Sequence, residues 1–263
     1  MSKSVTSHIE PLGSNQDHII VGSTATFDYM IVFDGHGKGK CIESIKLFDW
    51  NKIISNVSAK QILSAINREL LLKCGTLSRD GSTISIVKIY KDKVHVLWLG
   101  DSQVHLLIDD NYYKTTNHNT HNTTETQRET NIINLNNTFK VIDKHTCKPV
   151  IGKYFVLSNG DLLAFSRTLG HDFATLQRFD ELEIPLNNDS TIKILAATDG
   201  LYDMLYEETP LTIYNNYKAK DFTTLAKSRW MQTWNIYTDN YLNVSPVSFR
   251  NDMDDVAVVV YEK

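Results

Sequence analysis

Four aspartates stand at the ends of short apolar segments of the chain. Three of them follow such a segment and lie beside a glycine: Asp34 in IVFDG, Asp101 in VLWLGD and Asp199 in ILAATDG. The fourth, Asp254, precedes the run VAVVV near the C-terminus. Because short apolar runs of this kind predict buried strands, we expect these carboxylates to lie at strand ends. Oxygen ligands gathered at strand ends are suited to a hard cation such as Mg²⁺ or Mn²⁺.

The first of these aspartates begins the motif Asp34-Gly35-His36-Gly37. It places an imidazole two residues after a carboxylate, and an imidazole exchanges a proton near neutral pH. The motif therefore indicates acid–base chemistry beside a metal site. A glycine after the aspartate also lets the backbone approach an ion closely.

Each of these residues has an ordinary structural interpretation as well. A single Asp-Gly pair after a strand is usually a turn, and a lone histidine in a glycine-rich turn is usually exposed to solvent. Asp101 can cap the turn at Ser102, and Asp203, in the segment LYDML, is expected to cap a helix. For Asp255 the roles of ligand and of mere neighbour both stay open, and Asp254 is preferred as the ligand.

The overall composition excludes several classes of protein. A length of 263 residues is enough for a sizeable core, and a net charge of −4 with no lysine- or arginine-rich block argues against nucleic acid or a membrane as partner. No apolar run approaches the roughly 18 residues that span a bilayer, and the N-terminal segment lacks the apolar core of a secretory signal. The three cysteines are far apart and predict no disulfide framework. We therefore expect an intracellular, cytoplasmic protein that is a monomer.

The spacing of apolar residues predicts the elements that must position the aspartates. Residues 17–21 and 27–33 are expected to form a strand pair, and 78–90 with 93–108 a second, antiparallel pair. Between 42 and 74 apolar residues recur at steps of three and four, which predicts helix, with Gly75 as its end. Further strands are expected at 153–158, 161–166, 192–198 and 256–262, and helices at 201–217 and 221–237.

Residues 114–138 form the most polar stretch, in which asparagine and threonine dominate. This composition predicts a mobile surface loop that contains one short helix near 125–133. Its two histidines, His118 and His121, have no matching second cluster of metal-binding residues, so we expect them to be ordinary loop residues.

No repeat or linker divides the sequence, which predicts a single domain over residues 1–263. Alternating blocks of strands and helices favour antiparallel sheets with helices packed outside in layers.

Taken together, the motifs resemble the PPM/PP2C family of metal-dependent protein serine/threonine phosphatases. The matching segments come in the family's order and cover nearly the whole chain, and six or seven in register are a strong signal. They are Asn15-Gln16-Asp17, Val32-Phe33-Asp34-Gly35-His36-Gly37, Gly81-Ser82-Thr83, Leu99-Gly100-Asp101-Ser102, Asn159-Gly160-Asp161-Leu162 with Ser166-Arg167-Thr168-Leu169-Gly170, Ala197-Thr198-Asp199-Gly200-Leu201-Tyr202-Asp203, and Asp254-Asp255.

The resemblance implies an α+β fold, a four-layer α-β-β-α sandwich of two mainly antiparallel sheets flanked by helices. It also implies a centre of two or three Mn²⁺ or Mg²⁺ ions. By position, Asp34 would bridge two ions and the Gly35 carbonyl would ligate one of them. The remaining implied ligands are Asp199 and Asp254 at the first metal site, Asp17 in the first acidic motif, and Asp101 with Asp199 at a third site.

The implied chemistry explains why such residues are needed. A phosphomonoester dianion barely reacts with water, so catalysis must neutralise charge and activate a nucleophile together. Two divalent ions about 4 Å apart accomplish both. The leaving alkoxide is strongly basic, so His36 would act as the general acid. Arg167 is expected to form a structural salt bridge or hydrogen bond rather than to hold phosphate.

The sequence departs from the family pattern at three places. Gln16 replaces one carboxylate of the first acidic motif, which removes a negative charge from the second metal site. Leu12 stands where an arginine or lysine normally grips the substrate phosphate, and the nearest basic residues, His8 and Lys3, are out of register. His171 occupies a position at which the family usually has aspartate. We expect weakened substrate binding and intact metal chemistry.

Three functions are therefore compared. The leading hypothesis is a Mn²⁺- or Mg²⁺-dependent phosphatase that acts on phosphoserine or phosphothreonine in phosphoprotein substrates. The alternative is a catalytically weak or inactive pseudophosphatase of the same architecture that serves as a partner-binding module; Gln16 and Leu12 favour it, and the retained aspartates disfavour it. A third and weaker hypothesis is a two-metal hydrolase of another phosphoester, such as a nucleotide.

Overall fold

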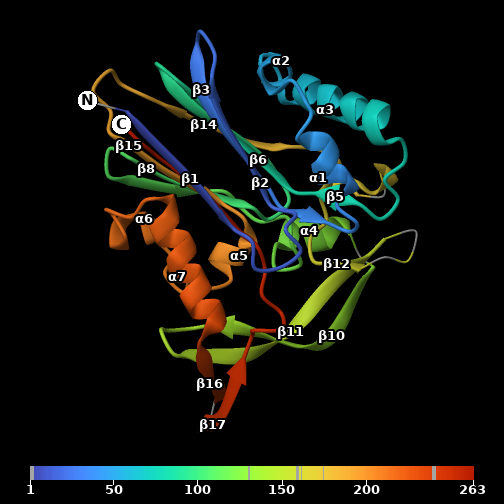
Figure 1. Cartoon of the computed structure of the whole chain (residues 1–263), viewed down its shortest axis with the longest axis vertical. Helices are drawn as coiled ribbons and strands as arrows, with labels where there is room; N and C mark the ends of the chain where they lie inside the picture. The colour runs from blue at the N-terminus through green and yellow to red at the C-terminus, as the bar shows by residue number, and fades with distance from the viewer. Residues whose placement is uncertain (1–2, 130, 158–159, 161, 174, 239–240) are drawn as a thin grey trace.

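Two five-stranded sheets form the centre of the molecule (Figure 1). The computed structural model describes residues 3–129, 131–157, 160, 162–173, 175–238 and 241–263. The first sheet has the order β1 (Ser4–Glu10), β18 (Val256–Glu262), β15 (Ile192–Ala197), β8 (Gln103–Ile108) and β9 (Asn111–Lys114). The second has the order β14 (Asp180–Pro185), β7 (Lys93–Leu99), β6 (Ile84–Tyr90), β3 (Phe27–Phe33) and β2 (His18–Ser23). Every neighbouring pair in both sheets is antiparallel.

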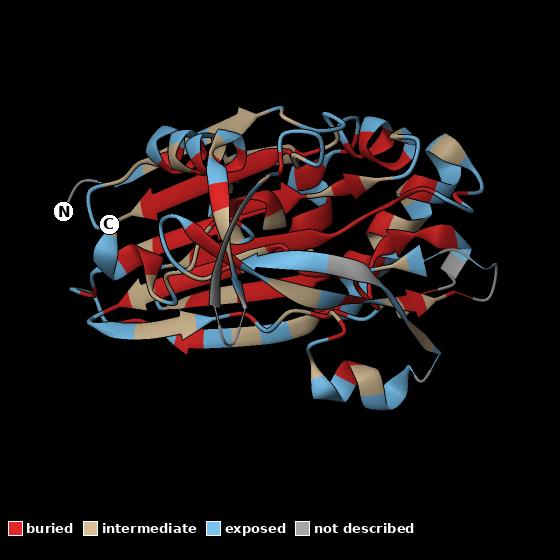
Figure 2. Ribbon diagram, turned by 90° about the horizontal axis from the view of Figure 1, so that it is seen from below, coloured by how far each residue is buried: buried red, intermediate tan, exposed pale blue. Residues whose placement is uncertain are grey.

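Strand β3 shows how the apolar runs of the sequence build this core. Successive side chains of a strand point to opposite faces, so an uninterrupted apolar run buries both faces. Met30 and Val32 pack between the two sheets, while Ile31 and Phe33 pack on the outer side, and all four are at most 1% exposed. The buried interior strands stand out in Figure 2. Runs such as IVF and VAVVV therefore mark strands that are covered on both faces.

Helices cover the outer face of each sheet, on opposite sides of the molecule (Figure 1). Helices α1 (Lys40–Ile45), α2 (Trp50–Ile54) and α3 (Ala59–Cys74) pack on the second sheet, and α5 (Asp199–Tyr202), α6 (Pro210–Ile213) and α7 (Ala219–Met231) pack on the first. Ser58 and Gln61 form a capping box at the start of α3, and Gly75 ends it with a positive φ of 64°. The predicted α+β class and its four α-β-β-α layers are confirmed.

Two smaller sheets complete the fold. One joins three short strands, β13 (Leu169–Gly170), β5 (Gly81–Ser82) and β4 (Gly35–His36), in that order. The other, which we name the accessory sheet, consists of β10 (Ile132–Val141), β11 (Thr146–Val156), β16 (Thr233–Thr238) and β17 (Tyr241–Ser248), with β12 (Leu162–Leu163) paired to β11. It lies beyond α7 at the lower end of Figure 1.

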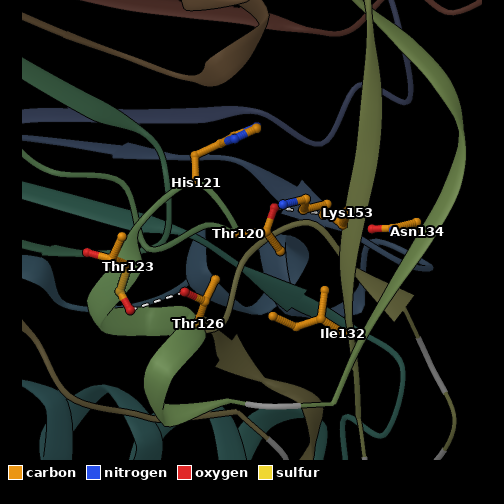
Figure 3. Close-up of a pocket in the computed structure, with 7 residues that line it drawn as sticks. All are labelled: Thr120, His121, Thr123, Thr126, Ile132, Asn134 and Lys153. Atoms are coloured by element: carbon orange, nitrogen blue, oxygen red, sulfur yellow. Dashed lines mark hydrogen bonds between the residues drawn. The ribbon is translucent and has the colours of Figure 1, made fainter.

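The accessory sheet corrects the predicted loop at 114–138. The short helix is present as α4 (Thr123–Arg128), but β10 begins at Ile132, inside the segment expected to be loop. Backbone pairing with β11, for example Ile132 with Phe155, outweighs the low strand propensity of asparagine. Between α4 and β10 lies a hollow of about 440 Å³ (Figure 3). Its lining contains none of the predicted site residues: Thr120, His121, Thr123, Thr126, Ile132, Asn134 and Lys153.

Other predicted elements need smaller corrections. The helical stretch at 42–74 is divided into α1, α2 and α3, and the helix expected at 221–237 ends at Met231 and gives way to β16. The strand expected at 93–108 is divided into β7 and β8, which belong to different sheets, and β1, β4, β9, β13, β14 and β17 were not predicted. Asn159 and Asp161 of the predicted motif lie outside the described residues. In the described part of the chain, no helix combines the length and the apolar character needed to span a membrane.

Candidate metal centre

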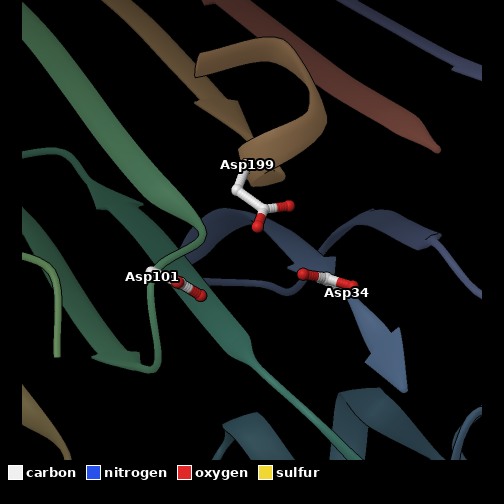
Figure 4. A group of neighbouring side chains, drawn as sticks. All are labelled: Asp34, Asp101 and Asp199. Atoms are coloured by element: carbon white, nitrogen blue, oxygen red, sulfur yellow. The ribbon is translucent and has the colours of Figure 1, made fainter. Parts of the chain in front are cut away.

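Three of the predicted aspartates converge at one end of the two central sheets. Asp34, Asp101 and Asp199 each offer a carboxylate oxygen, and these atoms lie within 4.8 Å of one another (Figure 4). Asp34 follows β3, Asp101 lies in the turn between β7 and β8, and Asp199 begins α5 after β15. The structure thus joins strand ends from both sheets at a single point, as the sequence predicts.

Hydrogen bonds hold the turns that present Asp34 and Asp101. The Thr83 N–H donates to the Asp34 carbonyl (2.9 Å), and the Asp34 N–H donates to Thr83 Oγ1 (3.2 Å). Thr83 Oγ1 also lies 2.6 Å from Ser102 Oγ, and Ser85 Oγ donates to the Ser102 carbonyl at 2.6 Å. The hydroxyl groups of Thr83 and Ser102 therefore link the turn at Asp34 to the turn at Asp101.

A second set of bonds joins Asp17 to the start of α5. Thr198, the residue before Asp199, donates from Oγ1 to Asp17 Oδ2 at 2.7 Å. Thr198 Oγ1 also accepts from the Ala257 N–H (3.0 Å), and the Thr198 N–H donates to the Ala257 carbonyl (3.1 Å). Asp17 is 6% exposed. The threonine fixes one Asp17 oxygen and the position of Asp199 relative to β18.

The two adjacent aspartates before β18 take different roles. Asp255 is 2% exposed and accepts from the backbone N–H groups of Gly13 (2.8 Å) and Gln16 (2.9 Å). Asp255 therefore ties the N-terminal loop to the C-terminal strand. Asp254 accepts from the Asp255 N–H at 2.8 Å and belongs to the electrostatic surroundings of Asp34 and Asp199. Asp254 as the metal ligand of the pair stays a prediction.

Glycines permit close backbone approaches at the site. A Cβ on Gly200 would lie 2.0 Å from the Asp255 carbonyl oxygen. A Cβ on Gly35 would lie 2.2 Å from Ile42 Cγ1 and 2.7 Å from the Gln16 carbonyl oxygen. Real Cβ atoms do not approach heavy atoms this closely, so both positions require glycine. Close packing of the backbone explains two of the Asp-Gly pairs in the sequence.

The electrostatics of the cluster favour an added cation. Burial and the mutual repulsion of the carboxylates raise the pKa of Asp17, Asp34 and Asp101 well above the ordinary value. Burial and neighbouring carboxylates raise the pKa of Asp199 and of Asp254 to about 7. Among the residues that the structure describes, no ion pair joins a lysine or arginine to any of these five aspartates. A divalent cation would supply the missing positive charge.

Two further observations show that the residues fit a hard cation. Asp101 Oδ1, Asp199 Oδ1 and Gln16 Oε1 are buried and have no hydrogen-bond partner among the described residues. Buried polar atoms are normally paired, so unpaired oxygens at one place need an explanation. Carboxylate and amide oxygens are the ligand types that Mg²⁺ and Mn²⁺ prefer.

Asp203, for which the sequence analysis preferred a role as helix cap, adds to the electrostatics of the cluster. It was expected to cap a helix, but it lies at the C-terminal end of α5, where a carboxylate has no free N–H groups to accept from. Loss of surrounding water and the charge of Asp254 raise the pKa of Asp203 to about 6, and Asp203 in turn raises the pKa of Asp101 and Asp199. Its membership of the ATDGLYD segment was the only sequence signal.

His36 lies beside the cluster but is turned toward another histidine. Its Nε2 is 2.7 Å from Nε2 of His171. Burial and the neighbouring His171 lower the pKa of His36 to about 3, which a hydrogen bond with the Asp34 backbone partly opposes. A neutral ring in the metal-free geometry is the reverse of what the predicted general acid needs.

A buried polar network supports the Asp101 turn from behind. The Gly100 N–H donates to His118 Nδ1 (3.0 Å), and His118 Nε2 lies 3.0 Å from Asp180 Oδ2. Arg167 bonds Asp180 Oδ1 (2.7 Å) and Glu125 Oε1 (2.5 Å). The structural salt bridge predicted for Arg167 is confirmed. His118 is fully buried, so its predicted place in a mobile surface loop is wrong.

At the position where the family pattern has its phosphate-binding arginine, this chain has the apolar residue Leu12. Leu12 packs against the apolar cluster of the first sheet and α7. Lys3 pairs with Asp28 at 2.5 Å, and His8 Nδ1 lies 2.9 Å from Thr223 Oγ1. Both basic candidates are thus engaged elsewhere.

Comparison with known proteins places this fold and site in a family. The family model for Protein phosphatase 2C matches residues 3–227. A Caenorhabditis elegans sex-determining protein is 16% identical with a TM-score of 0.65, over 100% of this chain and 65% of that chain. Serine-threonine phosphatase 2C from Toxoplasma gondii is 15% identical with a TM-score of 0.62, and the likeness covers 99% of this chain and 94% of that chain. A third structure is the catalytic domain of the phosphatase PstP in complex with two manganese ions; PstP is known from Mycobacterium tuberculosis. It is 14% identical with a TM-score of 0.55, and the likeness covers 99% of this chain and 97% of that chain.

No curated protein sequence matches the chain. At these identities the structural likeness establishes a common fold, and the family match extends over most of the sequence. The chain belongs to the protein phosphatase 2C family. The match ends before Asp254, so that aspartate is assigned to the site from its position alone.

Proposed function

We propose that this chain hydrolyses phosphoserine and phosphothreonine in proteins with the help of two Mn²⁺ or Mg²⁺ ions. One observation supports the proposal above all: Asp34, Asp101 and Asp199 hold three carboxylate oxygens within 4.8 Å, and no lysine or arginine of the described chain is paired with them. The family's metal dependence and the manganese-bound PstP structure agree with it.

Specific residues would hold the ions. Asp34 would bridge them, with the Gly35 carbonyl beside it, because this aspartate is held by Thr83 at the end of a buried strand. Asp199 and Asp254 would complete the first site and Asp17 would serve the second; Asp101 with Asp199 would form a third. When bound, such ions neutralise phosphate charge and lower the pKa of a water molecule.

The chain's own residues would orient the carboxylates and protonate the leaving oxygen. Thr83, Thr198 and Asp255 fix the turns that present the carboxylates, so little rearrangement is needed when a phosphate arrives. His36 would donate a proton to the leaving oxygen, and a phosphate dianion beside the ring would favour its charged form. Leu12 offers the phosphate no charge-assisted bond, so a high KM is expected.

The experiment compares metal-dependent turnover of matched variants. Wild-type protein is assayed with p-nitrophenyl phosphate and a phosphopeptide, with Mn²⁺ or with EDTA. Asp34→Asn and Asp199→Asn are expected to lower kcat by at least about 100-fold, while Asp110→Asn, an exposed carboxylate elsewhere, leaves it unchanged. Folded wild-type protein without metal-dependent turnover would refute the proposal. We also propose that the chain is a monomer with a single domain, and light scattering on the same samples measures its molar mass in solution.

A second candidate function rests on the missing cation. Because Leu12 packs into an apolar cluster and both nearby basic residues are engaged elsewhere, an inactive module that binds a partner is the competing interpretation. Calorimetric titration with Mn²⁺ separates the two when combined with the assay. Binding that is lost in Asp34→Asn together with turnover favours the enzyme, and binding without turnover favours the inactive module.

A further inference from the structure

The smallest sheet of the fold brings two histidines from distant parts of the chain side by side. Gly81 of β5 pairs with His36 of β4 on one side and with Gly170 of β13 on the other, and His171 follows directly. A Cβ on Gly81 would lie 2.5 Å from His36 Nε2 and 2.7 Å from His171 Cδ2. Only glycine therefore leaves room for both rings above this position.

The two rings make a directed contact rather than a loose one. Their Nε2 atoms are 2.7 Å apart, and the rings are nearly parallel, with 14° between their planes and 4.9 Å between their centres. Phe165 packs against His36 at 4.9 Å. His171 is 3% exposed. At this distance one Nε2 must donate and the other must accept, so a single proton lies between them.

The backbone that delivers His171 is strained. Gly170, His171 and Asp172 follow one another with positive φ values of 81°, 50° and 47°. A left-handed conformation is unfavourable for a non-glycine residue and persists only where the surroundings enforce it. Two contacts enforce it here: the His171 N–H donates to the Asp80 carbonyl (3.0 Å), and Asp172 Oδ1 accepts from the Leu77 N–H (2.6 Å). Such strain is typical of functional sites.

We propose that His171 is a positioning residue that fixes the orientation and tautomer of His36 through the bond between their Nε2 atoms. The inference rests on the proposed function, in which His36 serves the leaving group. Since the partner ring either donates to or accepts from Nε2 of His36, it determines which of the two His36 nitrogens carries the proton. His171 contacts His36 directly, and it is through this contact that it would act on the site.

Two substitutions separate the hydrogen bond from the backbone conformation. His171→Asn tolerates the left-handed backbone but is too short to reach His36, whereas His171→Phe keeps a stacked ring without a nitrogen. His121→Asn, at an exposed histidine of the polar segment, is the matched control. Near-UV circular dichroism and urea unfolding establish that each variant is folded.

The first measurement does not depend on activity. Long-range ¹H–¹⁵N spectra of the metal-free, full-length protein report the tautomer of each imidazole, and His36→Gln assigns the His36 signals. We expect opposite tautomers for His36 and His171 in the wild type, and a changed or mixed His36 tautomer in both His171 variants. An unchanged His36 spectrum in both variants would overturn the proposal.

The second measurement compares leaving groups in the manganese-loaded enzyme. A p-nitrophenolate departs without a proton, whereas phenolate needs one. We expect both His171 variants to lose at least about tenfold in kcat with phenyl phosphate and less than about twofold with p-nitrophenyl phosphate, and His121→Asn to lose neither. Equal losses with both esters would contradict a positioning role. Wild-type protein inactive on both esters would refute the proposed function, while the spectra would still decide the histidine contact.

Discussion

Replacing a buried histidine of β8 should change how stability depends on pH. His105 of β8 is 3% exposed; its Nδ1 lies 2.7 Å from Tyr112 Oη and its Nε2 lies 3.2 Å from Gln103 Oε1. Tyr202 stacks on the ring at 4.9 Å, and Lys114 is the charged group whose field reaches it. No carboxylate offers this imidazole a counter-charge among its described partners, so the folded protein holds it neutral.

The direction and size of the effect follow from the pKa. Burial, and then the charge of Lys114, lower the pKa of His105 to about 3, against about 6.5 in an unfolded chain. Between these values the unfolded state binds more protons, so the free energy of unfolding falls as the pH falls below about 6.5. At pH 5 the difference is about 1.5 pH units, or about 2 kcal/mol. Burial also raises the pKa of Tyr112 and Tyr202, so neither phenol ionises in this range.

Urea unfolding at pH 8 and pH 5, with EDTA present, measures this contribution. His105→Gln keeps hydrogen-bonding groups but cannot ionise, and the aspartate cluster titrates equally in both proteins. The loss of stability from pH 8 to pH 5 should be about 2 kcal/mol smaller in the variant than in the wild type. His145→Gln, at an exposed histidine, should match the wild type. The reasoning is wrong if the wild type and His105→Gln show the same pH dependence.

Three further changes test the packing around the site. Gly200→Ala, whose Cβ would lie 2.0 Å from the Asp255 carbonyl oxygen, should weaken Mn²⁺ binding at least about tenfold by calorimetry; unchanged affinity would contradict the close approach. Phe222→Ala, at a fully buried ring of α7, should lower the free energy of unfolding by about 3–5 kcal/mol in urea, and a loss below 1 kcal/mol would count against the assigned core. Arg167→Ala should lower the free energy of unfolding by about 1.5–3 kcal/mol in urea, because it removes charge-assisted bonds from the buried Glu125 carboxylate, which keeps Arg128 and Ser166 as partners; an unchanged stability would contradict this structural role.

The carboxylate cluster and the central sheets are predictable because their signals are local. An apolar run that ends in Asp-Gly identifies a buried strand and the carboxylate at its end without reference to the rest of the chain. Asp34 and Asp199 both follow this rule, and both lie in the cluster. The burial of alternating β3 residues against two different layers is likewise determined by the strand period.

The parts that were missed depend on contacts between distant segments. Trp230 and Trp234 are four residues apart and therefore imitate a helical face, but α7 ends at Met231 and Trp234 is buried from β16. His118 lies in a polar segment, yet it is buried. Its two ring nitrogens form hydrogen bonds with groups remote in sequence: Nδ1 accepts from the Gly100 N–H, and Nε2 bonds with Asp180. No periodicity in the sequence indicates such partners.

The accessory sheet has a consequence for how this protein can be altered. Its two hairpins come from stretches of chain far apart in sequence, and they meet through a short parallel contact in which Thr146 pairs with Asn235 and Cys147 with Ile236. An isolated two-stranded hairpin is at best marginally stable in water, and an uncovered edge strand invites aggregation. Deleting either hairpin would therefore leave the other without its neighbouring strands and prone to aggregation. An engineered variant should therefore keep both hairpins or remove both.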